Sequence, residues 1–370
     1  TSSCGGSNRF AASAFEPGSG STIMGYAGLC GVEDLQMNSD DTFHAGSIAQ
    51  IDAFTDSAGL LACATQSPTF NADPVILSGT TDRVIPVNTP FELDKGMVVD
   101  SDPVSYQWDQ MNSGSATDAS SFGTDLGDNP LFRSYPPRTD SRRKFPALGT
   151  QLNDEFDDAE VLPCSARNLD FRLTVRDLNG GQATDDVRVT VDANSGPFRV
   201  TSFATPQTIT AGSPLFVEWN PANTNRAPVS CQNVNIDLLT FNDASYSRYS
   251  VHTLMAGAVN DGGQVINFPM PGLSHPRARL RVKCSNNIFY DISDADLIIT
   301  GTSPSSFYSD SDEKTYFNGG GTVGTTASSC SANVLSERSG GGSGAIDVRW
   351  MLLLSLLFSA VKTYRRYGLQ

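Results

Sequence analysis

The sequence lacks the features of a nucleic-acid-binding protein and of an EF-hand protein. Its 370 residues include 25 Lys and Arg against 40 Asp and Glu, which gives a formal charge of −15. Such a charge repels phosphate backbones and argues against nucleic-acid binding. No stretch has the spacing of an EF-hand loop, although acidic loops of other kinds can collect Ca²⁺. Long helical periodicity is also missing, which leaves a β protein as the expectation.

Metal-binding and redox spacings of cysteine are absent as well. No Cys-x-x-Cys pair occurs, and no cysteine and histidine group has zinc-finger spacing. Scattered cysteines favour disulfides in an oxidising compartment, and their odd number leaves at least one free or paired outside the chain. The seven cysteines are Cys4, Cys30, Cys63, Cys164, Cys231, Cys284 and Cys330.

Turn-forming residues, in contrast, are abundant. The sequence holds 33 Gly and 20 Pro, with Ser, Thr, Asn and Asp throughout, which is typical of short strands joined by many turns. A chain of 370 residues exceeds what one hydrophobic core normally serves, so we expect two or three domains. The composition predicts a mainly β protein.

Period-two alternation predicts a β-sandwich over residues 67–195. Residues 177–181 separate its last two strands as a hairpin turn would. Residues 112–162, rich in Asp, Pro and Arg, are expected to form an irregular insertion. The strands are expected at 84–87, 91–93, 105–108, 171–175 and 187–191.

A second sandwich is expected over residues 196–301, because the dipeptide Gly196-Pro197 marks a boundary. Cys231 and Cys284 lie at strand edges, from which a disulfide could staple this sandwich. Its strands are expected at 198–200, 215–219, 234–238, 278–282 and 297–299.

The end of the chain changes character. Residues 302–339 are rich in Ser, Gly and Thr and too poor in apolar residues to fold alone, so we expect a flexible linker. Residues 350–361 are an apolar run of 12, which as a helix would span about 18 Å of a hydrocarbon core of roughly 30 Å. We expect one hydrophobic helix over 346–361 with its cationic end on the cytoplasmic side. A buried core helix is the alternative.

Residues 1–66 combine a glycine-rich loop with one short helix. Asp40 or Asp41 is expected to cap that helix, with Ile48, Ile51 and Phe54 on the face that packs on a core. The loop, residues 16–28, reads Glu-Pro-Gly-Ser-Gly-Ser-Thr-Ile-Met-Gly-Tyr-Ala-Gly.

This loop resembles the Met-turn of metzincin peptidases, in which a methionine lies beneath a zinc ion. The resemblance identifies Met24 as the Met-turn residue and Tyr26 as an auxiliary group. The order of Cys4-Gly5-Gly6 before it and Phe43-His44-Ala45-Gly46-Ser47 after it is similar to reprolysin-like bacterial metallopeptidases. Without that resemblance, the loop is only a turn with two buried side chains.

The chain departs from this family at the zinc site. The only histidines are His44, His252 and His275, and no His-Glu-x-x-His motif occurs, so the chain alone is not expected to hydrolyse peptides. His44 is expected to be a helix-start or packing residue. Because the first residue is Thr1 and no signal peptide precedes it, we expect a truncated N-terminus, with the zinc ligands and the catalytic base encoded upstream.

Two further resemblances concern the sandwiches and the tail. The segment 99–108 is similar to bacterial cadherin-like or polycystic-kidney-disease-like Ig modules. In some of these modules an Asp-x-Asp segment helps to hold calcium, and the resemblance makes Asp100 and Asp102 the candidates for that role. A solvated turn is the alternative. The second sandwich looks like an accessory Ig-like module of secreted bacterial peptidases. The tail, residues 340–370, is similar to the GlyGly-CTERM sorting signal of Gram-negative bacteria. In that family a rhombosortase-type intramembrane protease cleaves substrates of type II secretion, here near Gly340, Gly341, Gly342, Ser343 and Gly344.

Together these observations predict the C-terminal piece of a metzincin α/β domain, two Ig-like β-sandwiches, a disordered linker and one hydrophobic helix. The implied function is that of a secreted or cell-surface zinc endopeptidase acting on proteins or peptides, with zinc in the complete enzyme and calcium in an Ig-like module. The alternative is a non-catalytic surface binding or adhesion protein built of Ig-like modules. A plain membrane-anchored structural protein is a third reading.

Overall fold

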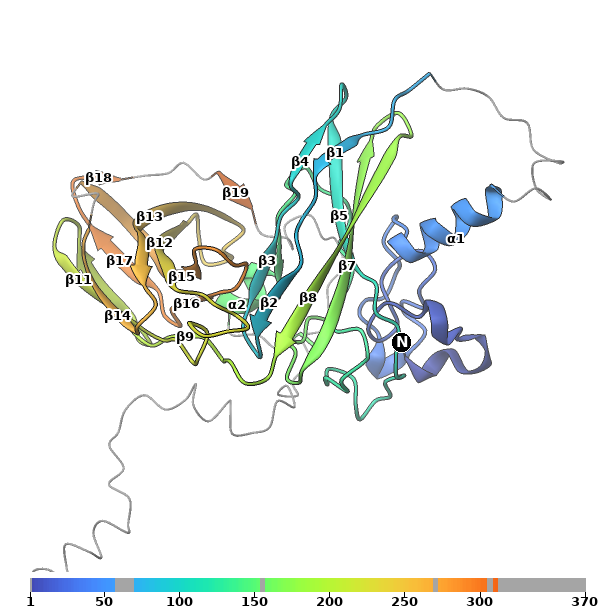
Figure 1. Ribbon diagram of the computed structural model, residues 1–370, viewed down its shortest axis with the longest axis horizontal. Coiled ribbons are helices and arrows are strands. Elements are labelled where there is room, and N and C mark those ends of the chain that lie inside the picture. Colours follow the sequence, from blue (N-terminus) through green and yellow to red (C-terminus); the bar gives the residue numbers. More distant parts are fainter. Residues whose placement is uncertain (1, 57–69, 154–156, 269–271, 305–308, 312–370) are drawn as a thin grey trace, which may run out of the picture. The chain divides into compact units, whose positions relative to one another are not determined.

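The structure, a computed structural model, describes residues 2–56, 70–153, 157–268, 272–304 and 309–311 (Figure 1). All described residues belong to one compact unit, Thr1–Cys330. Part of the predicted linker 302–339 is paired in the sheet, as β18 Ser303–Pro304 and β19 Asp310–Ser311, so the expectation of a flexible linker is wrong there. Residues 312–339, the sorting residues 340–344 and the hydrophobic helix 346–361 lie outside the described residues. Among the described helices, none has the length and apolar character needed to cross a membrane.

Residues 2–56 contain four short helices joined by loops. Helix α1 is the longest, and its first turn is capped by His44, whose Nδ1 accepts a hydrogen bond from the backbone N of Gly46 at 2.9 Å. Capping by Asp40 or Asp41 was predicted and is wrong, because His44 occupies the position next to the helix. The helices are η1 Ser3–Asn8, η2 Ala11–Ser13, η3 Gly31–Glu33 and α1 Ala45–Thr55.

The predicted apolar face of α1 is not packed on a core. Ile51 and Phe54 are 43% and 63% exposed, and the buried residues of the helix are Ala45 and Gly46. The helix therefore approaches the rest of the chain with its small first residues. A Cβ atom at Gly46 would lie 2.4 Å from a ring carbon of Phe15, so glycine permits this close approach.

The first sheet system comprises β1 to β8. A four-stranded sheet has the order β2-β8-β7-β5, in which β2 runs parallel to β8 and the other pairs are antiparallel. The predicted hairpin at residues 177–181 joins β7 to β8. The strands are β1 Val75–Ser78, β2 Arg83–Pro86, β3 Phe91–Leu93, β4 Met97–Val99, β5 Val104–Gln110, β6 Arg143–Phe145, β7 Arg167–Asp177 and β8 Gln182–Asp192.

The second sheet system comprises β9 to β19. One sheet has the order β10-β17-β15-β12-β13-β19, with β16 and β18 also paired to β15, and the other has the order β14-β11-β9. The strands are β9 Arg199–Val200, β10 Gln207–Thr210, β11 Pro214–Asn220, β12 Asn233–Phe241, β13 Arg248–Val259, β14 Gly263–Asn267, β15 Leu273–Cys284, β16 Tyr290–Ile292, β17 Leu297–Thr300, β18 Ser303–Pro304 and β19 Asp310–Ser311.

One buried apolar cluster extends through both sheet systems. Strands pair within each system, yet Phe91 of β3 forms an isolated bridge with Phe289, and Phe289 packs edge-on against Phe198 at 5.4 Å. The cluster is therefore shared between the systems. Residues 67–195 and 196–301 stay the predicted module boundaries.

The segment 112–162 is more ordered than predicted. It contributes β6, the helix α2 Leu148–Leu152 and the buried rings of Phe132 and Phe145. Phe145 stacks on Phe91 with ring centroids 4.9 Å apart. The expectation of an irregular insertion is wrong for these residues. The segment is rich in Asp, Pro and Arg, but a few apolar residues within it fill the core and order the backbone around them.

Candidate functional site

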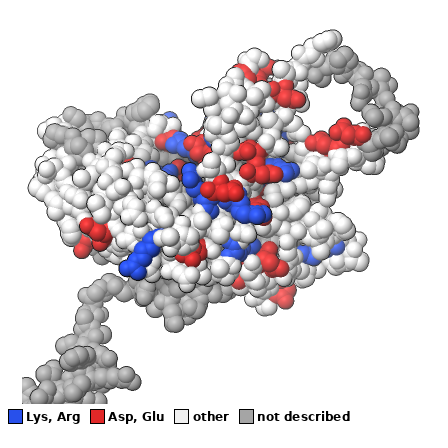
Figure 2. Space-filling view, in the orientation of Figure 1, with Lys and Arg blue, Asp and Glu red and all other residues white. Residues whose placement is uncertain are grey.

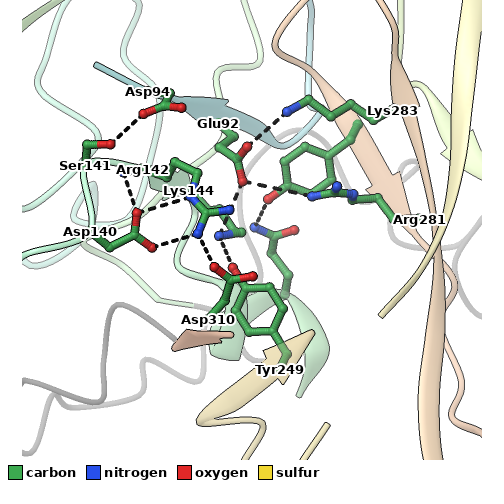
Figure 3. Close-up of polar contacts among 12 residues, drawn as sticks. Glu92, Asp94, Asp140, Ser141, Arg142, Lys144, Tyr249, Arg281, Lys283 and Asp310 are labelled. Carbon is green, nitrogen blue, oxygen red and sulfur yellow. Dashed lines mark hydrogen bonds and ion pairs between the residues drawn. The ribbon is translucent and has the colours of Figure 1, made fainter. Parts of the chain in front are cut away.

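A buried group of charged residues joins the two sheet systems (Figure 3). Glu92 lies at its centre: its Oε1 accepts a hydrogen bond from Lys283 Nζ at 2.9 Å, and its Oε2 lies 3.3 Å from Lys144 Nζ. Arg281 Nη1 lies 4.0 Å from the same Oε2, and Lys144 donates to the Tyr249 hydroxyl at 2.6 Å. Three cations therefore surround one carboxylate, and we refer to these residues as the junction ion group.

Strand pairing positions this group. Arg281 and Lys283 lie two residues apart on β15, so their side chains share one face of the sheet. Asp237 of β12 pairs with Arg281, and its Oδ2 accepts a hydrogen bond from Arg281 Nη2 at 2.7 Å. On the other side, the pairing of β3 with β6 places Glu92 opposite Lys144. Ladder neighbours thus carry opposite charges.

The electrostatics keep both partners ionised at neutral pH. Burial alone would raise the pKa of Glu92, but Lys144, Lys283 and Arg281 hold it well below the usual range of a carboxyl. Burial opposes the charge of Arg281 too, and Glu92 and Asp237 nevertheless raise its pKa. Because removing one partner would leave an unmatched buried charge, the group fixes strands of the two systems to each other.

More polar contacts continue from the ion group toward β19. Arg142 contacts Asp140, with Nη2 3.1 Å from Oδ2, and also bonds Asp310 (Figure 3). Ser141 donates to Asp94 at 2.6 Å. These contacts tie the chain before β6 to β3 and to β19.

A polar cavity of about 490 Å³, which we call the junction basin, adjoins the ion group. Its floor is one face of β12, β13 and β15, and its wall includes Arg83 of β2 and the loop 285–288. On the molecular face in Figure 2, basic side chains lie among acidic ones, so no large area there carries one sign of charge. The polar floor residues are Asn235, Asp237, Thr253, Arg281 and Lys283.

The predicted Met-turn segment, residues 16–28, is a tight loop closed by Glu16. Glu16 Oε1 accepts hydrogen bonds from the backbone N of Ser21 at 2.8 Å and of Thr22 at 3.1 Å, and Oε2 accepts from Thr22 Oγ1 at 2.6 Å. Gly18 has φ of 48°, and a Cβ there would lie 2.5 Å from the backbone O of Glu33. The loop geometry therefore requires glycine at this position.

Met24 and Tyr26 project from this loop rather than into a core. They are 67% and 37% exposed, so the plain alternative of a turn with two buried side chains is wrong. Both line a cavity of about 450 Å³, together with Phe15, Ile51 and Phe54. Residues 2–56 thus carry an open cavity of mixed polar and apolar lining with a methionine on its wall.

The histidines do not gather into a metal site. His44 is buried and stacks on Phe15 with ring centroids 5.4 Å apart, in agreement with a helix-start or packing role. His252 lies in β13 and His275 in β15, and burial lowers the pKa of each. The one group of three metal-ligating side chains found in the described part of the chain contains no histidine. These donors do not fit the zinc ion that the Met-turn resemblance implies.

That one group is acidic. Carboxylate oxygens of Asp100, Asp102 and Asp177 lie within 4.8 Å of one another, and oxygen donors are those that Ca²⁺ prefers. Asp100 Oδ1 also accepts a hydrogen bond from the backbone N of Asp102 at 2.7 Å, as in the predicted turn. The geometry accommodates both readings of the Asp-x-Asp segment. Asp177 was recognised only as a turn residue, because it ends β7, far along the chain from Asp100 and Asp102.

The cysteines are oxidised where the structure describes them. Cys231 and Cys284 form the predicted disulfide, with Cα atoms 5.9 Å apart, which links the approach to β12 with the end of β15. Cys4 and Cys30 form a second disulfide within residues 2–56. Cys164 is disulfide-bonded as well.

Comparison with known proteins gives a likeness to solved structures only. No family model and no curated protein sequence matches the chain. The N-terminal Ig1-2 module of the Drosophila receptor protein tyrosine phosphatase DLAR matches 62% of this chain and 100% of its own, with 13% identity and a TM-score of 0.33. The described strands and sheets make the chain a mainly β protein, and its likeness is to tandem Ig-like modules.

Two other solved structures match over a similar share of the chain. The titin domains z1z2 in complex with telethonin cover 63% of this chain and 99% of their own, with 13% identity and a TM-score of 0.21. Fibronectin(III)-like modules of Clostridium thermocellum CbhA cover 62% and 95%, with 8% identity and a TM-score of 0.20. Likeness at this level concerns the fold alone. Disulfide-bonded Ig-like domains are consistent with an extracellular protein.

Sequence reasoning missed the junction ion group and the junction basin. Glu92 and Lys283 are 191 positions apart in the chain, and no local spacing connects them. A weak signal was available: each lies in a segment predicted as a strand or directly after one. A charged residue in the middle of a short apolar strand, such as Glu92 between Phe91 and Leu93, calls for a buried partner.

Proposed function

We propose that this chain is an extracellular, non-catalytic binding protein whose two Ig-like sandwiches act as one rigid unit. The observation that carries the proposal is the junction, where Glu92 is buried among Lys144, Arg281 and Lys283. Flexible linkers between modules need no such buried contact, whereas a binding surface built from two modules does. The junction basin, with floor and wall from both systems, would be preformed in this unit.

The test uses the full chain in two parallel assays. In the first, immobilised neutral and acidic polysaccharides and collagen-like peptides are offered to the protein. We expect retention on at least one of them with half-saturation below about 1 mM, an affinity of about −4 kcal/mol or tighter. In the second, quenched peptide substrates are incubated with the protein and added Zn²⁺, and we expect no cleavage. Retention on none of the polymers, or zinc-dependent cleavage of peptides, would contradict the proposal.

The second candidate is the zinc endopeptidase implied by the Met-turn resemblance, of which this chain would be an inactive C-terminal portion. What favours it is the exposure of Met24, together with Tyr26, on a cavity of about 450 Å³. No catalytic step is assigned to residues of this chain, because its described donors do not fit zinc. An in-frame His-Glu-x-x-His motif within a few tens of codons upstream of Thr1 would support this candidate, and an unrelated upstream gene would contradict it.

The tail proposal applies to either candidate. Residues 340–370 would direct export through type II secretion, with removal of the hydrophobic helix near Gly340–Gly344 by a rhombosortase-type protease. The protein would then reach the medium or the outer cell surface after transient inner-membrane anchoring through residues 346–361. Mass spectrometry of the exported protein tests this: an intact Arg365-Arg366 end contradicts it.

A further inference from the structure

The hydrogen-bonding groups of the junction basin are mainly donors without acceptors. The guanidinium of Arg83, which is exposed, makes no hydrogen bond or ion pair with any described side chain. Lys283 uses one of its three N–H groups on Glu92, and Asn235 uses its carbonyl oxygen to accept from Gly257 N at 3.0 Å, which leaves its NH₂ group to the basin. A ligand of this basin must therefore accept hydrogen bonds.

The carboxylates at the basin are already occupied. Asp237 Oδ2 accepts from Arg281 and its Oδ1 accepts from Thr253 Oγ1 at 2.9 Å. Glu92, which adjoins the floor, is matched by three cations. The charged side chains that line the basin are Arg83, Arg281 and Lys283 against Asp237, so cations are in excess there although the chain has a formal charge of −15. This excess favours an oxyanion.

The strand arrangement disfavours a peptide as that ligand. At the floor, β12 is paired on both sides, with β13 and β15, and β15 is paired with β12 and β16. Neither β12 nor β15 has an open edge there to bind an extended backbone, and of the described floor strands only β13 is paired on one side alone at Val251 and Thr253. The apolar lining is limited to Val251, Ile288 and the Cys284 side of a disulfide, which is little for peptide side chains.

Carbohydrate acids match the remaining features. The cavity of about 490 Å³ has the size of a small-molecule site, and its polar lining suits a ligand covered with hydroxyl groups. The formal charge of −15 repels polyanions in general, and least those that carry a single carboxylate per sugar residue instead of several sulfate or phosphate groups. The basin can pair one such carboxylate with Arg83 and Lys283.

We propose that the junction basin binds the carboxylate of an acidic polysaccharide of the uronic acid type, with Arg83, Lys283 and Asn235 as its hydrogen-bond donors. This inference rests on the proposed binding function and gives it a ligand class. Arg281 is a positioning residue, because its guanidinium is held by Asp237.

The test is calorimetric titration of the full chain with tri-galacturonic acid and, in parallel, with its methyl ester, which keeps the shape and removes the charge. Arg83→Glu removes an exposed guanidinium that makes no hydrogen bond or ion pair with a described side chain, so we expect the fold to be kept. Asn235→Asp keeps the acceptor for Gly257 and replaces the NH₂ donor by a carboxylate oxygen. Arg226→Glu is the matched control, because Arg226 is exposed and does not line the basin.

We expect the acid to bind and the methyl ester to bind at least tenfold more weakly. Arg83→Glu and Asn235→Asp should each lower the association constant at least tenfold, and Arg226→Glu should change it less than twofold. Equal binding of acid and ester, or unchanged binding by Arg83→Glu, would overturn the ligand class. A triglutamate peptide that binds more tightly than the sugar acid would overturn it as well. These outcomes overturn only the ligand class: the proposed binding function still stands if the protein is retained on one of the immobilised polymers. Zinc-dependent cleavage of peptides, in contrast, would overturn the binding function itself.

Discussion

Residues 2–56 and the two sheet systems differ in what they bury. In the sheets, Phe91, Phe145 and Phe171 are at most 1% exposed. In the N-terminal segment, Met24 and Leu29 are 67% and 77% exposed, and fully buried positions include polar side chains instead. Apolar burial is the main favourable term in folding. The difference therefore indicates that the sheets contribute most of the free energy of folding, and that residues 2–56 stay folded because they are attached to the sheets.

The attachment of the segment supports this view. Thr42 Oγ1 donates to Gln107 Oε1 at 3.0 Å, and the backbone N of Ala45 donates to Asp109 Oδ2 at 2.9 Å. Gln107 and Asp109 are buried residues of β5. Hydrogen bonds of this kind fix orientation, while each adds only about 1 kcal/mol or somewhat more. The segment is thus placed by the sheet and contributes little to its core.

The largest expected effect is that of Phe91→Ala, in the core that both sheet systems share. Loss of the buried ring should lower the free energy of unfolding by about 4 kcal/mol. Urea unfolding followed by circular dichroism should show one transition at a lower midpoint, since both systems lose packing. Phe216→Ala, at a ring that is 51% exposed on β11, is the control and should cost much less. Two separate transitions would break the idea of a shared core.

Next in size is Glu92→Gln, which removes the carboxylate shared by buried Lys144 and Arg281 and half-buried Lys283. We expect a loss of about 3 kcal/mol at neutral pH. The folded-state pKa of Glu92 is depressed, so its stabilisation is present above the unfolded pKa of about 4.3 and is lost as pH falls below that value. The difference between wild type and variant should therefore shrink on acidification.

A surface ion pair provides the control for that variant. Arg172 and Asp186 are bonded at 2.7 Å, yet the Asp186 side chain is 63% exposed. Asp186→Asn should cost less than about 1 kcal/mol at any pH. Equal losses from Glu92→Gln and Asp186→Asn, compared by thermal unfolding at several pH values, would show that burial does not distinguish the two pairs.

A smaller and local effect is expected from His44→Ala, in the segment. Loss of the cap and of the stacked ring should cost about 1 to 2 kcal/mol. Hydrogen exchange should accelerate in α1 and stay unchanged in β7 and β8, because the sheet does not depend on the helix. His44→Asn restores a capping acceptor and should recover part of the protection. Faster exchange throughout β7 would contradict the view that the sheet is stable independently of residues 2–56.

The smallest effect is expected from Met24→Ala, because 67% of that residue is already exposed. The unfolding midpoint should shift by an amount equivalent to less than about 0.5 kcal/mol. Leu93→Ala, at a fully buried side chain of the sheet, is the matched comparison and should cost about 3 kcal/mol. Similar shifts for the two variants, measured by thermal unfolding, would erase the contrast between the regions.

The sequence predicted those parts of the fold that depend on local pattern. The β3 bounds, Phe91–Leu93, and the hairpin at 177–181 follow from alternation and turn residues, and both were predicted. Strand β13 was not, since its ladder with β12 shifts register twice and Gly257 within it has φ of 72°. Bulges of that kind interrupt the period-two pattern from which strands are read.

The candidate site was largely beyond prediction for a related reason. The disulfide Cys231–Cys284 could be proposed because only seven residues can take part in such a bond. Glu92 has 25 Lys and Arg as conceivable partners, and the choice among them depends on how β3 meets β15. Likewise, Asp177 joins Asp100 and Asp102 only once β5 and β7 are paired.

The bridge between Phe91 and Phe289 bears on how the gene can be rearranged. Exchange of whole domains between genes requires a crossover point on either side of which each piece keeps its own hydrophobic core buried. A crossover between the codons for Asp192 and Arg199 would leave Phe91 on one product and Phe289 on the other, each facing water. We therefore expect this pair of sandwiches to be inherited, duplicated and recombined as a single block.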